Sequence, residues 1–262
     1  MLSEIIIAVR KAGEFVLSAH SGYAIKEKAN NKDYVTEYDV ETQRVLVEEL
    51  KKIQPEARFL CEESDERQDA DLSDGCLFII DPIDGTTNFI KGYAHSAVSV
   101  AFCRDGCLTA GVVHNPFSGE IFYAERGGGA FLNGRPIHAD TCGINGGIGL
   151  FGTSPTAPEL REKTFAVASM MYEKMWDVRR TGSAALDLCY IACGRVVAFA
   201  EYVLYVWDFA AGKLIAEESG AVVTKMDGLP LGMEKHVSVL AGTPAAHAQF
   251  LELLRERGLA AG

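Results

Sequence analysis

The chain has 262 residues, of which 48% are hydrophobic and 23% are charged, the ordinary balance of a folded globular protein. This composition excludes a disordered or fibrous chain, and the length allows one large domain or two closely packed halves. The formal net charge of −11 argues against a broad nucleic-acid surface or an anionic membrane as partner, because both need clustered Lys and Arg.

The cysteines and the N-terminal segment bear on location. Seven cysteines without a C-x-x-C pair indicate neither a disulfide framework nor a zinc site, and they favour a reducing compartment. The apolar run at 5–9 is broken by Arg10 and Lys11, too early for a signal-peptide core, and no later segment has membrane-spanning length. We therefore expect a cytoplasmic protein.

Two amphipathic helices are predicted first. Apolar residues recur with helical spacing over 2–20, and a second helical pattern over 36–53 opens with Thr36 and Asp39 at capping-box spacing. From residue 76 the pattern changes to β-rich runs separated by Gly-containing turns, which predicts an antiparallel meander. Its strands are expected at 76–81, 97–106, 108–119, 120–129 and 130–137.

After about residue 147 strands and helices alternate, which is typical of an α/β arrangement. Strand-like runs are found at 148–152, 178–182, 196–201, 221–225 and 237–242, with helices near 157–175 and 183–193, from about 208 and at the C-terminal end. We divide the chain into an N-terminal half, 1–147, and a C-terminal half, 148–262. Since no linker separates them, the halves are expected to pack as one unit with the ligand site in a cleft between them.

The segment DPIDGTT brings two aspartates, Asp81 and Asp84, to the end of a short apolar strand. A surface turn alone would explain Asp, Pro and Gly at such a place. Two carboxylates this close repel each other unless a cation lies between them, however, and an all-oxygen set favours a hard ion such as Mg²⁺, with Mn²⁺ as a substitute. The carboxyl ends of strands are where α/β folds bind ligands, so a metal site is predicted here.

Further acidic residues occur at comparable positions. Glu62 and Glu63 follow another short apolar run, Asp208 lies between a strand-like run and a helix start, and Asp39 ends the segment VTEYD. Each has an ordinary structural explanation as well: Asp208 as a helix N-cap, Asp39 as the capping-box acid, and the glutamates as part of a solvated acidic run. Several acids at strand ends nevertheless favour one shared site.

These motifs resemble those of the inositol monophosphatase family of metal-dependent, lithium-sensitive phosphatases. DPIDGTTNF, WDFAAG, the EES acids and the K-x-x-x-x-D-x-V-T-x-x-D run from Lys28 to Asp39 stand in the family's order, and the resemblance covers essentially the whole chain. It implies an α/β fold of the α+β layered kind, an αβαβα sandwich of the sugar-phosphatase type. It also implies a homodimer.

The resemblance further implies two or three Mg²⁺ ions. One ion is held by Glu62, Asp81 and the main-chain carbonyl of Ile83, and a second by Asp81, Asp84 and Asp208, so that Asp81 bridges the two. A third, more hydrated ion lies at Glu62. The predicted metal ligands therefore come from both halves of the chain.

The same resemblance implies the catalytic groups. Thr86, paired with Asp39, orients and activates the attacking water, and Glu62 contributes through its ions, so that no covalent intermediate is formed. The N–H groups of Gly85 and Thr86 hold phosphate oxygens at the start of a short helical turn. Lys28 adds charge at the edge of the cleft, although a lone Lys is usually just solvated.

For the alcohol half of the substrate, the resemblance indicates the TGSAA segment and an acid seven residues before Asp208. The implied substrate-binding residues are Asp84, Gly85, Thr86, Gly182, Ser183, Ala184 and Glu201. Tyr205 departs from the animal inositol phosphatases, which carry a histidine at the position three residues before this aspartate. The preference for inositol is therefore left open.

Three functional interpretations are carried forward. The first is hydrolysis of inositol 1-phosphate, and the second is hydrolysis of fructose 1,6-bisphosphate by a member of the same family. The third is a binding role, because at least one bacterial member is a partner of the transcription machinery in ribosomal RNA synthesis. A haloacid-dehalogenase site is disfavoured, because its D-x-D-G-T motif has one residue between the aspartates and this chain has two. We expect a small-molecule phosphate ester as partner, without a membrane or direct nucleic-acid binding.

Overall fold

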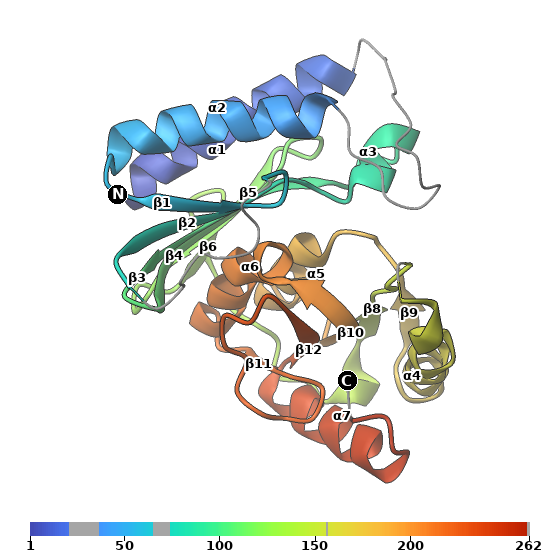
Figure 1. Cartoon of the computed structure of the whole chain (residues 1–262). Coiled ribbons are helices and arrows are strands. Elements are labelled where there is room, and N and C mark those ends of the chain that lie inside the picture. Colours follow the sequence, from blue (N-terminus) through green and yellow to red (C-terminus); the bar gives the residue numbers. More distant parts are fainter. Residues whose placement is uncertain (21–36, 65–73, 156, 261–262) are drawn as a thin grey trace.

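The chain is built from five layers in the order α, β, α, β, α (Figure 1). The computed structural model describes residues 1–20, 37–64, 74–155 and 157–260. Two helices cover the outer face of a seven-stranded sheet, two lie between this sheet and a five-stranded sheet, and two cover the far face of the second sheet. The predicted layered αβαβα sandwich is confirmed.

Helices α1 (Leu2–His20) and α2 (Glu37–Ile53) form the first layer. Their apolar stripes, which include Ile5, Val9 and Leu46, are buried against the first sheet in one core cluster. An ion pair between Lys11 and Glu49, 2.6 Å long, joins the two helices on the solvent side. Both helices were predicted, although Thr36 lies outside the described residues, so the expected capping box is not observed.

The first sheet has the strand order β1-β2-β3-β4-β5-β6-β7. Its strands are β1 (Arg58–Cys61), β2 (Cys76–Asp84), β3 (Ala97–Arg104), β4 (Cys107–Asn115), β5 (Glu120–Glu125), β6 (Ala130–Leu132) and β7 (Arg135–Ile137). Strands β2 to β7 are antiparallel neighbours, as the meander prediction required. Strand β1 pairs in parallel with β2 and adds an edge strand to the meander.

A β-bulge lies in β2 between the two aspartates. Asp81 pairs with Ser99 of β3, whereas Asp84 pairs with Ala97, so β2 carries one residue more than its neighbour over this interval. In a regular strand, residues three apart point to opposite faces. The extra residue instead turns Asp84 to the face of Asp81, toward the central layer, while Ile83 joins the core under α1 and α2.

Helices α5 (Ala184–Ala192) and α6 (Val206–Glu218) make up the central layer. Most residues of both helices are buried, because each helix contacts both sheets. Strand β4 approaches α6 so closely at Gly111 that a Cβ there would lie 2.8 Å from the Ala211 carbonyl oxygen. This contact holds α6 against the first sheet, and the candidate site lies at the starts of α5 and α6.

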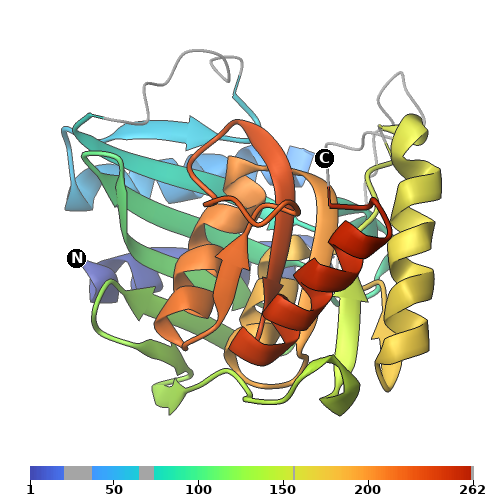
Figure 2. The same cartoon turned by 90° about the horizontal axis from the view of Figure 1, so that it is seen from below.

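The second sheet has the order β11-β12-β10-β8-β9. Its strands are β8 (Ile148–Phe151), β9 (Asp177–Arg179), β10 (Ala198–Tyr205), β11 (Val222–Thr224) and β12 (His236–Gly242). Helices α4 (Arg161–Lys174) and α7 (Pro244–Glu256) lie on its outer side (Figure 2). Strand β10 runs to Tyr205 rather than ending at 201, and α6 begins two residues before the predicted 208.

Three short elements complete the structure: α3 (Thr86–Lys91), η1 (Ile144–Gly146) and η2 (Pro158–Leu160). Helix α3 follows β2 directly and carries the end of the DPIDGTTNF motif. None of the helices in the described part of the chain is long and apolar enough to cross a lipid bilayer.

Candidate active site

The fold brings four carboxylates to one edge between the two sheets: Glu62, Asp81, Asp84 and Asp208. Strands β1 and β2 are parallel, so their carboxyl ends meet, and the Glu62 N–H donates to the Ile80 carbonyl at 3.2 Å just beyond β1. Asp208 comes from the first turn of α6. Four acids that are distant in sequence therefore lie within electrostatic reach of one another.

Main-chain and hydroxyl donors orient the two strand aspartates. Asp81 Oδ1 accepts the Ile83 N–H at 3.0 Å. Asp84 Oδ2 accepts from Ser183 Oγ at 2.5 Å and from the Ala185 N–H at 2.8 Å, at the N-terminus of α5. These bonds connect the first sheet to the central layer and fix the plane of each carboxylate.

Asp208 is held by its own helix. Its Oδ2 accepts the Tyr205 N–H at 2.8 Å, as expected for an acid that satisfies an exposed donor at a helix start. The cap and the site are compatible, because the helix N-terminus also favours negative charge. The Tyr205 side chain lies 44% exposed with its ring stacked on Trp207, at 4.9 Å between ring centroids.

Burial raises the pKa of all four acids and is the largest cause in each case. Repulsion by neighbouring acids raises the pKa of Glu62, Asp81 and Asp208 further, so the pKa values of Glu62 and Asp81 lie well above those of free carboxyls. The pKa of Asp84 rises only to about 6, because the Ser183 hydroxyl and the N–H groups of α5 favour its charged form. Burial and the charge of Asp84 raise the pKa of Asp208 to about 8.

The donor chemistry of this group fits a hard divalent cation. All the candidate ligand atoms are oxygens, from the four carboxylates and the Ile83 carbonyl, which Mg²⁺ and Mn²⁺ prefer. Within 1–20, 37–64, 74–155 and 157–260, no three His, Cys, Asp or Glu side chains are gathered closely enough to form a ready metal site. A bound cation would offset the repulsion between these carboxylates. Their assignment as metal ligands stays a prediction, and this electrostatic argument is its physical basis.

The structure brings Thr86 and Asp39 together, the pair expected to handle the attacking water. Thr86 Oγ1 lies 3.4 Å from Asp39 Oδ1 and 3.1 Å from the Ile83 carbonyl oxygen. Asp39 is buried in the first turn of α2, so the outer helical layer contributes to the same site. The catalytic role of this pair stays a prediction.

Gly85 forms the turn that presents backbone N–H groups before α3. Its φ of +86° lies in the left-handed region, and a Cβ there would come within 2.9 Å of the Gly182 carbonyl oxygen. Only glycine therefore fits between β2 and the loop before α5. The turn that is predicted to hold phosphate thus packs directly on the segment that is predicted to hold the alcohol.

The residues predicted to bind the alcohol have the following surroundings. Ser183 is buried and its hydroxyl binds Asp84, and the Ala184 N–H also favours the charged form of that aspartate. The Glu201 carboxylate lies against Gly152, where a Cβ would come within 1.7 Å of it. Lys28 lies outside the described residues. The contacts of these groups with a substrate stay predictions.

Two residues at the site carried no role in the sequence-based prediction. Asn88 uses its amide nitrogen to donate to the His95 carbonyl at 2.7 Å and to the Thr181 carbonyl at 2.8 Å, and it thereby ties α3 to the loop before α5. Arg180 lies against Gly182 and lowers the pKa of Asp84 and Glu201. Asn88 stood within the quoted motif, but nothing in the sequence gave its partners.

The sequence and the structure were compared with those of known proteins, and the matches agree on one family. The model of the inositol monophosphatase family matches residues 1–259. Nus factor SuhB from Vibrio cholerae is 38% identical over 98% of this chain and 97% of its own, and Nus factor SuhB from Escherichia coli K12 is 37% identical over 98% and 96%. An inositol monophosphatase from Anabaena has a TM-score of 0.86 at 29% identity, covering 97% of this chain and 95% of that one.

These relatives correct one sequence-based prediction. We expected a small-molecule ester as the partner, with no nucleic acid, whereas relatives that align with 98% of the chain are named Nus factors. That expectation is wrong. Its physical weakness is that a net charge of −11 is a sum over 262 residues and does not describe any single surface. No observation tests the homodimer, the lithium sensitivity or the cytoplasmic location, which stay predictions.

The raised pKa values predict how stability depends on pH and metal. Asp84 and Asp208 bind protons more tightly in the folded than in the unfolded chain, so the metal-free protein loses stability as pH rises. Asp84 contributes mainly below pH 6, and Asp208 contributes as pH rises from 6 to 8. We expect the free energy of unfolding in urea to fall by about 2 kcal/mol over this interval. Asp208→Asn should flatten this dependence.

Mg²⁺ provides the complementary measurement. Since a cation binds the deprotonated carboxylates, Mg²⁺ should stabilise the protein more at pH 8 than at pH 6, and less in Asp208→Asn. Equal stabilisation at both pH values in the wild type would contradict the assignment of these acids as its ligands.

Asn88 gives a prediction that does not depend on metal. Asn88→Asp places a carboxylate oxygen opposite two carbonyls in a buried position, so we expect a loss of about 2–4 kcal/mol in the free energy of unfolding at pH 7.5. The matched control is Asn115→Asp, because the buried Asn115 accepts from Phe117 N and Ser118 N through Oδ1, a role that a carboxylate retains. Similar losses in both variants would show that Asn88 does not act through its donors.

Proposed function

The chain belongs to the inositol monophosphatase family, and from this premise we propose that it is a Mg²⁺-dependent phosphomonoesterase acting on a small polyol phosphate, inositol 1-phosphate first. The observation that carries the proposal is the placement of four acids with raised pKa where the ends of β1 and β2 face the start of α6. Such a cluster has little structural use without a cation, because its members destabilise one another.

The proposed roles follow from the contacts of each residue. Glu62, Asp81, Asp84, Asp208 and the Ile83 carbonyl would hold the ions. When bound, Mg²⁺ neutralises the phosphate, activates water and stabilises the leaving alkoxide. The donors from Ile83, Ser183, Ala185 and Tyr205 keep three of the carboxylates oriented. This orientation limits the reorganisation needed when substrate arrives.

Water and phosphate would be positioned by residues around the turn after β2. Thr86 lies within reach of Asp39, which would accept a proton relayed through the Thr86 hydroxyl from the attacking water. The N–H groups of Gly85 and Thr86, at the left-handed turn that begins α3, would hold phosphate oxygens. With water as the nucleophile, Asp81 forms no covalent phosphoenzyme.

On the alcohol side, Glu201 and Asp84 would accept hydrogen bonds from substrate hydroxyls. Asp84 binds Ser183, the residue after Gly182, and Glu201 lies within electrostatic reach of Asp84. Tyr205 rather than histidine lies near this region, so fructose 1,6-bisphosphate is kept as the alternative substrate. The proposed reaction, hydrolysis of a phosphate monoester, is therefore the same for either alcohol.

Phosphate release with and without Mg²⁺ tests the reaction. We expect Mg²⁺-dependent turnover of inositol 1-phosphate and a loss of at least about a hundredfold in Asp84→Asn, since that change removes a charged ligand. Asp177→Asn is the control, because Asp177 pairs with Arg179 on the surface, away from the acid cluster. A panel with fructose 1,6-bisphosphate, phosphoadenosine phosphate and histidinol phosphate names the ester. If Mg²⁺ and Mn²⁺ support turnover of none of them, the enzyme proposal is wrong.

A second candidate function is favoured by the names of the relatives. Proteins 37–38% identical to this chain are called Nus factor SuhB, so we also propose a role as a partner of the transcription machinery. The two roles are compatible, because Asp81 and Asp84 are buried and the outer surfaces of the layers remain for contacts.

Binding to purified bacterial RNA polymerase, with and without antitermination factors, tests this second role. We expect the immobilised protein to retain the polymerase, and Asp84→Asn to retain it equally, since the buried aspartate is not at the surface. Failure to bind under every combination would remove the second role and leave the first unaffected.

A further inference from the structure

One buried carboxylate close to the candidate site has no part in the proposed reaction. Asp187 is 2% exposed and lies in the first turn of α5, where it is the only charged residue of the helix. Burial raises the pKa of its carboxyl well above the usual range. A buried acid in an apolar layer costs folding free energy unless a partner compensates, so the contacts of Asp187 indicate what it does.

The hydrogen-bond partner of Asp187 is a threonine in the loop before α5. Thr181 Oγ1 donates to Asp187 Oδ1 at 2.5 Å. The main-chain carbonyl of the same threonine accepts from the Asn88 amide nitrogen at 2.8 Å. Thr181 is therefore held from two sides, by α5 through its side chain and by α3 through its main chain.

The two residues that follow Thr181 are predicted to bind the alcohol. Gly182 has a φ of +90°, and a Cβ there would lie 3.0 Å from the Asn88 amide nitrogen. The Ser183 hydroxyl donates to Asp84 Oδ2 at 2.5 Å. This loop is thus attached to α3, α5 and β2, so a displacement of Thr181 would move the groups that are predicted to face the alcohol.

The residue before Thr181 supplies positive charge to the same region. The Arg180 guanidinium opposes the burial that raises the pKa of Asp187 and of Glu201. Its Nε also donates to Thr153 Oγ1 at 3.2 Å, which connects the loop to the segment after β8. Asp187 therefore lies within electrostatic reach of Glu201, the acid proposed to accept hydrogen bonds from the alcohol.

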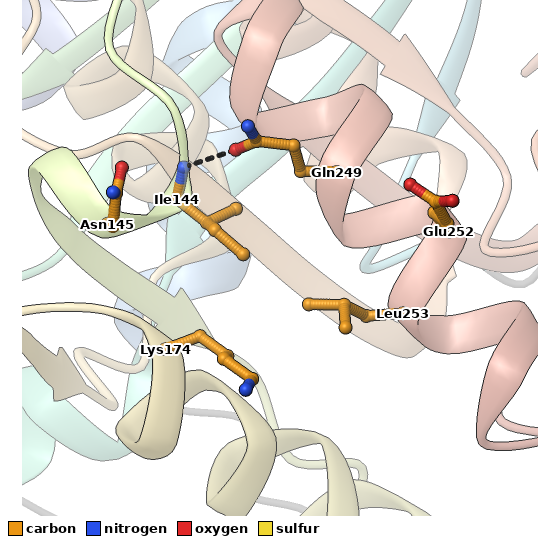
Figure 3. Close-up of a pocket in the computed structure, with 6 residues that line it drawn as sticks. All are labelled: Ile144, Asn145, Lys174, Gln249, Glu252 and Leu253. Carbon is orange, nitrogen blue, oxygen red and sulfur yellow. Dashed lines mark hydrogen bonds between the residues drawn. The ribbon is translucent and has the colours of Figure 1, made fainter.

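A comparable attachment on the outer side of the second sheet provides a contrast. A pocket of about 320 Å³ is lined there by η1, α4 and α7 (Figure 3). In its wall, Gln249 Oε1 accepts the Ile144 N–H at 2.9 Å. The buried Thr243 hydroxyl donates to the Cys142 carbonyl at 2.5 Å and accepts the Ala246 N–H at 3.0 Å. Main-chain groups, rather than a buried acid, are the partners here, and the loop lies across the second sheet from the candidate site.

We propose that Asp187 is a positioning residue for recognition of the alcohol: through the Thr181 hydroxyl it holds the loop before α5 where the hydroxyl groups of a polyol phosphate would meet it. This inference rests on the proposed phosphatase function and concerns the selection of the alcohol, not the metal-dependent step. A contact that only stabilised the start of α5 would affect all esters alike, whereas a positioning contact affects the choice between them.

Two esters separate positioning from stability. Inositol 1-phosphate presents hydroxyl groups to the loop, whereas the leaving group of 4-nitrophenyl phosphate carries none. We expect Thr181→Val to lower kcat/KM for inositol 1-phosphate about tenfold more than for 4-nitrophenyl phosphate, mainly through KM, because hydrogen bonds to the alcohol act in substrate binding. Equal losses for the two esters, or no loss for either, would overturn the proposal.

Further variants test whether the effect passes through this hydrogen bond. Thr181→Ser retains the hydroxyl and should keep the wild-type ratio of the two kcat/KM values. Asp187→Leu should lower the ratio as Thr181→Val does, and the double variant should lower it no further, because both changes remove one contact. The double variant leaves no unpaired buried acid, so it stays measurable if Thr181→Val alone does not fold. Additive losses in the double variant would contradict the proposal.

Thr243→Val is the matched control. It removes a buried threonine hydroxyl that holds a loop to the start of α7, so it should lower the stability to urea. The ratio of the two esters should stay at the wild-type value, because this loop is remote from the candidate site. A ratio lowered as much as in Thr181→Val would show that lost stability alone explains the effect.

A binding measurement separates this inference from the reaction. With Ca²⁺ in place of Mg²⁺, calorimetry should give a Kd for inositol 1-phosphate that is about tenfold weaker in Thr181→Val than in Thr181→Ser. Turnover with the same ester ratio and the same Kd in both variants would reject the positioning role alone. Absence of all turnover, with this difference in Kd retained, would reject the enzyme proposal and leave the role of Asp187. Absence of both turnover and binding in the wild type would reject both.

Discussion

Repulsion among four neighbouring carboxylates, two of them buried and two half-buried, is the constraint on which the rest of this structure depends. Burying even one unpaired charge is costly, and a domain has only a small net free energy of folding from which to offset it. The chain meets this cost with oriented donors: the Ile83 N–H for Asp81, the start of α5 for Asp84 and the Tyr205 N–H for Asp208. The central helices point their positive ends at the acids, so the middle layer serves both packing and electrostatics.

The elements with clear periodicity were predictable, because burial on one face leaves a direct trace in the sequence. The helices at 2–20 and 37–53, the meander from β2 to β7 and the alternation after residue 147 all have this property. The pairing of Asp81 with Asp84 was also visible, since both belong to one short motif. Their common orientation was not, because it depends on a bulge that the apolar run of β2 does not reveal.

The residues that were missed act through partners far away in the chain. Asn88 donates to the Thr181 carbonyl. Since every residue has a main-chain carbonyl, the sequence does not indicate which residue accepts such a hydrogen bond. Arg180 was read as part of a strand, and only the structure places it against Gly182 and Thr153. The prediction of a small-molecule partner alone failed for a related reason. Net charge does not tell where the charges lie, whereas a partner is recognised by one local surface.

The bulge in β2 has a consequence for how this protein can vary. Loops between the layers tolerate changes in length, but the interval from Asp81 to Asp84 must keep one residue more than the facing interval of β3. Deleting Pro82 or Ile83 would restore regular pairing and leave both carboxylates on one face, because residues two apart in a strand share a face. It would nevertheless remove the bulge, whose Ile83 N–H donates to Asp81 and whose Ile83 carbonyl accepts from Thr86. The site is therefore encoded in the number of residues as well as in their identity.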